Sequence, residues 1–434
     1  MDLFPHQEKM LETLSENDVF GIFWKPRVMK TLPVALHMTN LIMSGKAENA
    51  LVIAPKTALG AWKRDFYTFK GARFDATKKI DLVNYEKVWR RKDYDKKYDI
   101  VILDESHKIA HRTSKQSKFI KKYVKTSTYR YLLTGTPMGQ GRLQDLWNQM
   151  DFLIPNLLGT YAEFEARYCI LKQLPNTFVK IVVGYRNKEE LLEKIAPYVS
   201  FLTLDDIAEM PEETPDNIVI CPRAHQRIQA GVKKDYVEEF DMIIPNPAVK
   251  LAKLRQVASG FIKDEQGVTH SIADTKRLAF GELVDELCED KFVVFCEFVQ
   301  SIEDVITELR KRGISHLVLD GRQRDKEIWK LFQAEEHIKC IVCQYQTANA
   351  GIDLWKADNL IFYEPALSTL MVEQARERIK TAVNPKPKFY HWLIARDSVE
   401  LKIYKQLRKH QDFTLDCMSE WSWATKDEDK DYVF

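Results

Sequence analysis

Short apolar runs alternate with helix-like segments in two separate blocks of this 434-residue chain, and this alternation restricts the fold more than any other feature. The runs are VFGIFW, ALVIAP, KIDLVNYE, DIVILDE and YRYLLTGTP in the first block and KFVVFCEF, SHLVLDG, KCIVCQ, DNLIFYEP and KFYHWLIA in the second. Each run is short and ends at a polar or turn residue, as is typical of parallel strands buried on both faces. The pattern predicts an α/β fold with two doubly wound sheets, whose ligands lie at the carboxyl ends of the strands.

The segment between the two blocks has a mainly helical pattern. It contains NKEELLEKIAPYV and NPAVKLAKLRQVASGF, separated by the acidic, proline-bearing EMPEETPDN. A chain of 434 residues is long enough for two or three domains. We therefore expect a first lobe at 1–155, a helical bridge at 156–275, a second lobe at 276–410 and a C-terminal tail at 411–434.

The formal net charge is only +2, so any affinity for nucleic acid must come from local basic patches. No apolar run approaches the roughly 18–20 residues that span a bilayer, and the N-terminus lacks the layout of a signal peptide. We expect no membrane association and a cytoplasmic location, meaning the host cytoplasm for a viral protein. Seven scattered cysteines favour a reducing compartment. Cys340 and Cys343 form a C-x-x-C pair in an apolar run, which we interpret as buried thiols rather than a metal site.

The stretch FWKPRVMKT, residues 23–31, ends like a phosphate-binding loop but lacks its glycines. Lys30 and Thr31 are the pair that binds phosphates and magnesium in G-x-x-x-x-G-K-[ST], whose glycines would stand at Trp24 and Met29. Lys30 follows an apolar run and precedes the helix-like TLPVALHMTNLIM, and a helix N-terminus favours anions. Taken alone, a lysine at such a junction is more often surface charge.

Two carboxylates, Asp104 and Glu105, end the apolar run of VILDESHK. In nucleotide hydrolysis the first acid holds magnesium, while the second orients or deprotonates the attacking water. A solvated turn is the alternative for this pair taken alone. Because the acids and Lys30-Thr31 all follow predicted strands, together they favour a site for a nucleotide, with Mg²⁺ held by Thr31 and Asp104.

The order of short motifs resembles that of the superfamily 2 helicase-like ATPases, and within them the Swi/Snf-like double-stranded DNA translocases. In the first half the motifs are LFPHQ (3–7), KT (30–31), APKTALGAWKRDF (54–66), NYE (84–86), DESH (104–107) and LTGTP (133–137). In the second half they are LRQVASG (254–260), VVFCEF (293–298), TANAGIDL (347–354), FYEP (362–365), EQARERIK (373–380) and WLIARDSVE (392–400). The resemblance implies two RecA-like parallel-sheet lobes in tandem, joined by a helical bridge. The small size is similar to that of compact phage or prokaryotic members.

The resemblance also implies roles for individual residues. It implies adenine recognition by Gln7, other nucleotide contacts from Met29, Lys30, Thr31, Gly351 and Asp353, and catalysis by Lys30, Asp104, Glu105, Gln374 and Arg378. It implies that Thr134, Gly135 and Thr136 couple hydrolysis to strand contact. Contacts with the DNA backbone are expected from Lys56, Thr57, Lys63, Arg64, Lys108, Arg112, Lys115, Thr347 and Asn349. The basic run 107–122 is equally consistent with a solvated charged face.

The phosphate loop departs from the family pattern. Met29 stands where glycine lets the backbone approach phosphate, and Pro26 removes one N–H donor. A non-glycine residue held at positive φ costs about 1–2 kcal/mol, so we expect nucleotide binding to be weakened rather than abolished. Lys25 and Arg27 are either compensating cations or surface charge.

A second departure lies in QARERIKTAV. The first arginine of the family's Q-A-x-x-R-x-x-R pattern falls on Arg378, but the second falls on Thr381, which cannot act as an arginine finger. Lys380 is adjacent but faces about 100° away on a helix, and Arg376 could serve only in a different local register. A missing finger costs several powers of ten in rate, so this departure bears directly on turnover.

The sequence thus predicts an ATP-dependent translocase or helicase that acts on double-stranded or branched DNA as a monomer, in fork reversal, branch migration or protein displacement. The alternative is a catalytically weakened ATPase that serves as a nucleotide-regulated DNA-binding clamp, which Met29 and Thr381 support. A third reading is a helicase that acts on RNA. In that case tailed RNA would stimulate the ATPase activity better than duplex DNA does.

Overall fold

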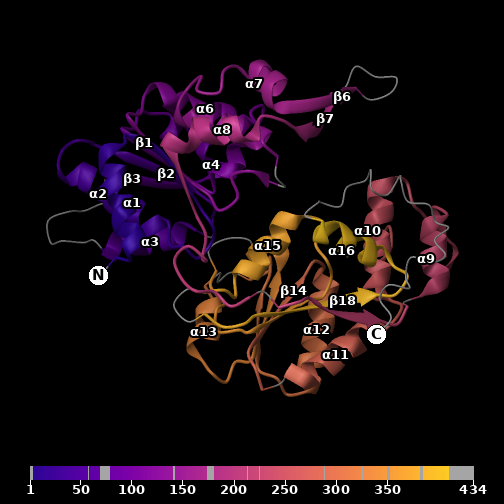
Figure 1. Ribbon diagram of the computed structural model, residues 1–434. Helices are drawn as coiled ribbons and strands as arrows, with labels where there is room; N and C mark the ends of the chain where they lie inside the picture. Colours follow the sequence, from indigo (N-terminus) through magenta and orange to yellow (C-terminus); the bar gives the residue numbers. More distant parts are fainter. Residues whose placement is uncertain are drawn as a thin grey trace. The chain divides into compact units, whose positions relative to one another are not determined.

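The computed structural model describes residues 3–56, 58–68, 79–139, 142–173, 180–212, 214–223, 225–287, 289–323, 327–348, 352–381 and 385–409 (Figure 1). The chain divides into two compact units, with the boundary between Pro211 and Glu212. Each unit contains one six-stranded sheet. The predicted α/β fold with two parallel-sheet lobes in tandem is therefore confirmed.

The sheet of the first unit has the strand order β3-β2-β4-β5-β1-β8. Its strands are β1 (Val19–Trp24), β2 (Ala50–Ala54), β3 (Ile80–Asn84), β4 (Ile100–Asp104), β5 (Tyr129–Leu133) and β8 (Val199–Leu202). Every pairing is parallel, so all six carboxyl ends lie at one edge of the sheet. The first five strands are the five runs predicted for the first block.

Helices cover both faces of this sheet because successive strand residues point to opposite faces. Along β4, Val101 and Leu103 join one apolar cluster, while Ile100 and Ile102 join the other. The helices that supply the second cluster are α1 (Pro5–Glu16), α2 (Thr31–Met43) and α3 (Leu59–Thr68). Those that supply the first are α4 (Tyr85–Val88), α5 (Lys115–Ile120), α6 (Gln144–Leu153), α7 (Tyr161–Tyr168) and α8 (Lys188–Ile195).

The sheet of the second unit has the order β15-β16-β14-β17-β18-β9, again with parallel pairings throughout. Its strands are β9 (Asn217–Cys221), β14 (Phe292–Cys296), β15 (His316–Leu319), β16 (Cys340–Gln344), β17 (Asn359–Phe362) and β18 (Phe389–Ala395). The helices are α9 (Gln226–Lys233), α10 (Pro247–Ala258), α11 (Thr275–Leu287), α12 (Val299–Lys311), α13 (Trp329–Ala334), α14 (Tyr345–Ala348), α15 (Thr369–Glu377) and α16 (Val399–Arg408).

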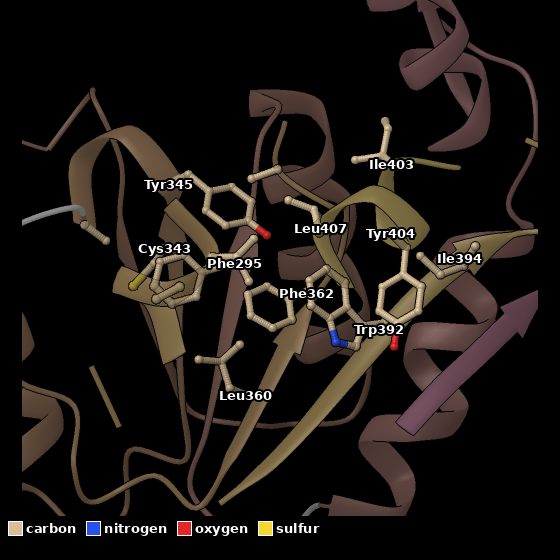
Figure 2. Packing of buried hydrophobic residues seen from close by; sticks show 14 of the residues in the cluster. Phe295, Cys343, Tyr345, Leu360, Phe362, Trp392, Ile394, Ile403, Tyr404 and Leu407 are labelled. Carbon is tan, nitrogen blue, oxygen red and sulfur yellow. The ribbon is translucent and has the colours of Figure 1, made fainter. Parts of the chain in front are cut away.

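Aromatic side chains dominate one face of the second sheet (Figure 2). Phe362 of β17 stacks on Trp392 of β18 with ring centroids 4.0 Å apart, and Tyr404 of α16 packs edge-on against Trp392 at 5.0 Å. These contacts fix α16 on the sheet through large buried areas. The opposite face packs against α11 and α12.

Residues 156–275 differ from the separate helical bridge that we expected. β8 joins the first sheet and β9 joins the second, and two further strands, β6 (Cys169–Gln173) and β7 (Lys180–Tyr185), form a hairpin. Small sheets are formed by β10 (Tyr236–Val237) with β11 (Met242–Ile243) and by β12 (Phe261–Lys263) with β13 (Thr269–Ser271). β8 and β9 are partly exposed edge strands, so they lack the continuous apolar run that marks a strand buried on both faces. The predicted tail, 411–434, lies outside the described residues.

The C-x-x-C pair lies in β16, and both thiols are buried. Burial raises the pKa of Cys340 and of Cys343, which keeps both thiols protonated. Among the described residues, no group of three or more His, Cys, Asp or Glu side chains could hold a metal ion. The interpretation as buried thiols is confirmed. No helix in the described part of the chain is long and apolar enough to cross a membrane.

Candidate nucleotide-binding site

Three loops meet at the carboxyl edge of the first sheet, because β4, β5 and β1 are parallel neighbours. Residues 25–30 follow β1, Asp104 ends β4 and Glu105 follows it, and residues 134–137 follow β5. The backbone N–H of Thr134 donates to Ile22 O at 3.2 Å, which holds the third loop against the first strand. The predicted phosphate loop, acid pair and coupling segment are thus brought together where α/β folds bind ligands.

The phosphate loop contains two residues with left-handed backbone. Arg27 has φ 73° and Met29 has φ 53°, while Lys30 is the N-cap residue of α2 and Thr31 its first residue. A side chain at positive φ costs about 1–2 kcal/mol, which glycine would avoid. The strain expected at Met29 is therefore confirmed, and Arg27 adds a second strained position.

The types of residue that have left-handed backbone distinguish this site from the rest of the described chain. Eight non-glycine residues have positive φ there, and five of them are Asn or Asp, which tolerate this conformation. The other three are Arg27, Met29 and Glu105, and all three lie in the loops just described. Backbone strain of this kind persists at functional sites, where the surrounding structure enforces it.

The first turn of α1 holds the phosphate loop. Gln7 is fully buried, and its Nε2 donates to Met29 O at 3.1 Å while its Oε1 accepts from Phe4 N at 3.0 Å. His6 Nε2 lies 3.1 Å from Val28 O, so two consecutive loop carbonyls are bound by α1. Adenine recognition by Gln7 stays a prediction, whereas its contact with the loop is direct.

Lys30 points back into its own loop. Its Nζ donates to Trp24 O at 3.4 Å, and its positive charge acts on Asp104. Thr31 opens α2, so its hydroxyl oxygen stands at the helix N-terminus. A lysine ammonium and free N–H groups at a helix start together favour a bound phosphate.

Asp104 is buried at the end of β4. Trp62 Nε1 donates to Asp104 Oδ2 at 2.9 Å, and the Tyr85 hydroxyl donates to the Asp104 carbonyl at 2.8 Å. Burial raises the pKa of Asp104 to about 6, the Glu105 charge adds to this rise, and Lys30 and Trp62 oppose it. A buried carboxylate of this kind is stabilised by a dication, and hard oxygen donors suit Mg²⁺, which binds through one or two carboxylates plus substrate phosphates. The pair Asp104 and Thr31 therefore fits magnesium.

Glu105 is joined to the coupling segment. Its Oε2 accepts from Thr134 Oγ1 at 3.3 Å and lies 3.3 Å from His107 Nδ1. The same His107 Nδ1 lies 3.0 Å from Thr134 Oγ1, and Thr136 N donates to Thr134 Oγ1 at 3.1 Å. A displacement of residues 134–136 would therefore reach Glu105 through hydrogen bonds.

The coupling segment also contacts the phosphate loop. A Cβ on Gly135 would lie 2.7 Å from Pro26 Cδ, so a side chain at Gly135 would push the two loops apart. Gln149 of α6 links the acid motif to the end of the coupling segment. Ser106 Oγ donates to Gln149 Oε1 at 2.7 Å, and Gln149 Nε2 donates to Pro137 O at 2.7 Å. All three loops are thus mutually connected.

In the second lobe, α15 carries Gln374 and is followed directly by Arg378. Arg378 is buried, and its carbonyl accepts from Leu354 N at 3.0 Å, so the segment containing Asp353 is joined to the end of α15. The Arg378 guanidinium lowers the pKa of Cys343 against the larger effect of burial, which places its charge near the carboxyl end of β16. Gly351 lies outside the described residues.

The two cations considered as substitutes for the second arginine have other partners. Arg376 is still within α15 and forms an ion pair with Asp216. Lys380 Nζ lies 3.2 Å from Glu377 Oε1. The register that would turn Arg376 into a finger is therefore not adopted, and Thr381 follows the helix without restoring the pattern.

The expected DNA contacts are mostly exposed side chains on the first lobe. Lys56, Lys63, Arg112 and Lys115 are exposed and Lys108 is half-buried, while Thr347 of the second lobe is half-buried on α14. Arg112 lies over the Tyr161 ring at 4.3 Å and Lys115 over the Trp89 ring at 5.8 Å. Farther along the basic run, Lys121 and Lys122 pair with Asp151 and Asp95. Arg64 lies in α3, and Thr57 and Asn349 lie outside the described residues.

Sequence reasoning missed several residues that support the site. Trp62 and Tyr85 both lie in motifs that we had identified, but nothing in their spacing shows that they bond Asp104. His6 precedes Gln7 directly, and Gln149 lies in α6 with no motif of its own. Only the fold brings Gln149 under the acid motif.

Two family models match the chain. Residues 70–227 match the SNF2-related domain, and residues 275–381 match the helicase conserved C-terminal domain. Among solved structures, the SWI2/SNF2 ATPase core of Sulfolobus solfataricus in complex with dsDNA is 23% identical with a TM-score of 0.44, covering 94% of this chain and 91% of that chain.

Curated relatives give the same assignment. An uncharacterized ATP-dependent helicase of Mycoplasma genitalium is 24% identical, over 93% of this chain and 41% of that protein. The SWI/SNF-related matrix-associated actin-dependent regulator of chromatin subfamily A-like protein 1 of Xenopus laevis is 21% identical, over 88% of this chain and 41% of that protein. The chain thus spans about two fifths of the length of these relatives. The chain therefore contains an SNF2-related domain and a helicase conserved C-terminal domain, and it is similar to Swi/Snf-type helicases.

Proposed function

We propose that this chain is a DNA-dependent ATPase that moves along double-stranded or branched DNA. The observation that carries this proposal is the connected site at the carboxyl edge of the first sheet, where Lys30 ends the loop after β1 and Asp104 and Glu105 stand at the end of β4. The strain at Arg27, Met29 and Glu105 supports a functional site at this edge, because strained backbone concentrates at such sites.

In this proposal the phosphates of ATP bind at the start of α2, beside Lys30. Mg²⁺ held by Thr31 and Asp104 would neutralise charge on the phosphate oxygens. Glu105, held by Thr134 and His107, orients the attacking water. Arg378 and Gln374 of the second lobe remain proposed catalytic residues of the hydrolysis reaction.

The link between Glu105 and residues 134–136 supports coupling of hydrolysis to movement on DNA. Exposed cations such as Lys56, Lys63 and Lys115 would contact the phosphate backbone, so binding is expected to be independent of sequence and sensitive to salt. The processes proposed are fork reversal, branch migration and displacement of bound proteins. We further propose that it acts as a cytoplasmic monomer of a compact phage or prokaryotic type.

A nucleotide-regulated clamp with little turnover is the second candidate. Two features favour it. Arg27 and Met29 of the phosphate loop are non-glycine residues with positive φ, and position 381 holds threonine instead of the second arginine. The clamp would bind duplex DNA in an ATP-dependent manner without hydrolysing ATP.

The deciding experiment measures ATP hydrolysis with and without blunt duplex DNA or a four-way junction. The motor predicts stimulation by DNA and, for Glu105→Gln, a loss of about 100-fold or more in kcat with ATP binding retained, since the water-positioning group is gone. Glu48→Gln is the matched control, because Glu48 is an exposed glutamate of the same lobe outside the site. A wild-type chain that binds ATP and DNA without turnover would favour the clamp, and an unaffected Glu105→Gln variant would refute the motor.

A further inference from the structure

A buried carboxylate stands where the chain enters the second sheet. Asp216 directly precedes β9, and it ends the connector that leads from β8 to β9. Its side chain is only 3% exposed. A charge that is this deeply buried requires partners, because an unpaired carboxylate in a protein interior is strongly unfavourable.

The main partner of Asp216 is Arg376 on α15. Arg376 donates to Asp216 Oδ1, and its guanidinium also lies over the Tyr390 ring at 4.3 Å. Arg376 lies two residues after Gln374 and two before Arg378. The carboxylate therefore contacts the helix that carries Gln374 and that is followed directly by Arg378, the two residues expected to act on the nucleotide.

Two further partners come from α16. The Tyr404 hydroxyl donates to Asp216 Oδ2 at 3.0 Å, and Arg408 Nη1 lies 3.5 Å from the same oxygen. Tyr404 is itself packed against Trp392 of the sheet (Figure 2). Asp216 thus ties the end of the connector to α15 and to a helix that is fixed on the sheet.

We propose that Asp216 is a positioning residue that holds α15, through Arg376, in the orientation from which Gln374 and Arg378 act. Because Asp216 ends the chain segment between the two sheets, a shift of that segment would move α15 as well. This inference rests on the proposed function, since it assigns Asp216 to the hydrolysis reaction. It also gives Arg376 a role other than that of an arginine finger, namely holding α15 through its ion pair with Asp216.

The test compares Asp216→Asn with Asp358→Asn. Asp358 is a matched control, since it also precedes a strand of the second sheet and pairs with a lysine, Lys388, at 2.6 Å. Asp216→Asn should lower kcat for ATP about tenfold with KM for ATP changed less than about twofold, because misplaced catalytic groups lower the rate of the chemical step. Asp358→Asn should leave kcat unchanged.

A second measurement does not depend on activity. Hydrogen exchange should be faster at α15 amides in Asp216→Asn and unchanged at those of α12, while Asp358→Asn should leave α15 as in the wild type. If Asp216 acts through Arg376, the double variant Asp216→Ala/Arg376→Ala should lose no more kcat than Asp216→Ala alone.

The inference is overturned if α15 exchange is unchanged in Asp216→Asn, or if both asparagine variants lower kcat equally. A wild-type chain without ATPase activity would instead refute the motor proposal. The exchange measurement would still decide whether Asp216 holds α15.

Discussion

Arg27, Met29 and Glu105 are the residues whose identity and backbone conformation disagree most in the described chain. Each has positive φ, and none is glycine, asparagine or aspartate. Arg27 and Met29 flank Val28, whose carbonyl, like that of Met29, is held by α1 through His6 and Gln7. The hydrogen bonds from α1 therefore enforce a loop conformation that the side chains alone would disfavour.

This conflict predicts that Met29→Gly improves the site. Glycine adopts φ 53° without the cost of a Cβ, so the variant should bind ATP about 5- to 30-fold more tightly, corresponding to about 1–2 kcal/mol. ATP affinity measured by titration with a fluorescent nucleotide checks this, together with the steady-state ATPase rate.

Asn156→Gly is the control for Met29→Gly, because Asn156 has φ 64° and lies in a loop away from the site. Asparagine already tolerates this conformation, so ATP affinity should be unchanged. Equal ATP affinity in Met29→Gly and the wild type would show that the loop strain does not affect nucleotide binding.

For single residues, the sequence was informative where the residue type and its position after an apolar run indicate a function. That Lys30, Asp104 and Glu105 lie at one sheet edge could be predicted, because all three follow apolar runs of the kind that form parallel strands. The bond from Trp62 to Asp104 could not, since it depends on the relative placement of α3 and β4. Asp216 was missed for the same reason, because its partners lie more than 150 positions farther along the chain.

At the scale of the elements, the loops after β1 and β5 can pack together only because residue 135 is a glycine, which has no Cβ. Gly135 faces Pro26 so closely that an added Cβ would lie 2.7 Å from Pro26 Cδ and 3.2 Å from its nitrogen. The proline ring is rigid, so it cannot move aside as a flexible side chain could.

We therefore expect Gly135→Ala to displace the phosphate loop and to raise KM for ATP, with kcat lowered as well, because residues 134–136 also hold Glu105. Gly184→Ala in the β6–β7 hairpin is the matched control, since its Cβ would make an ordinary 3.4 Å contact. Steady-state kinetics and thermal melts of both variants check the prediction. A Gly135→Ala variant with wild-type KM and kcat would show that the two loops are not packed as described.

The strands in the middle of each sheet and one edge strand of each, β3 and β15, could be predicted, whereas the other two edge strands, β8 and β9, could not. The central strands are continuous apolar runs because helices cover both of their faces. β8 and β9 keep partly exposed faces, so their residues alternate less clearly and resemble connector sequence. That is why the expected bridge at 156–275 contains strands of both sheets.

At the scale of the whole molecule, each lobe buries one neutral histidine among its described residues. His37 of the first lobe bonds Tyr131, and His391 of the second lies between Asn217 and Asn359. Asn217 Nδ2 donates to His391 Nδ1, while His391 Nε2 donates to Asn359 Oδ1, so the neutral ring is satisfied at both nitrogens. Burial lowers the pKa of each histidine to about 4.

This arrangement predicts that both lobes lose stability in mild acid. The folded-state pKa is depressed below the ordinary value of 6.5, so the stabilisation is present above pH 6.5 and is lost as the pH falls toward 4. Each histidine should cost about 2 kcal/mol between pH 7.5 and pH 5. Urea unfolding of the wild type, followed by tryptophan fluorescence at both pH values, measures this loss.

His391→Gln should be less stable at pH 7.5 but should lose less stability on acidification, whereas His337→Gln, at an exposed site, should retain the full wild-type loss. Equal losses in the wild type and His391→Gln would show that acid acts on the second lobe through other groups.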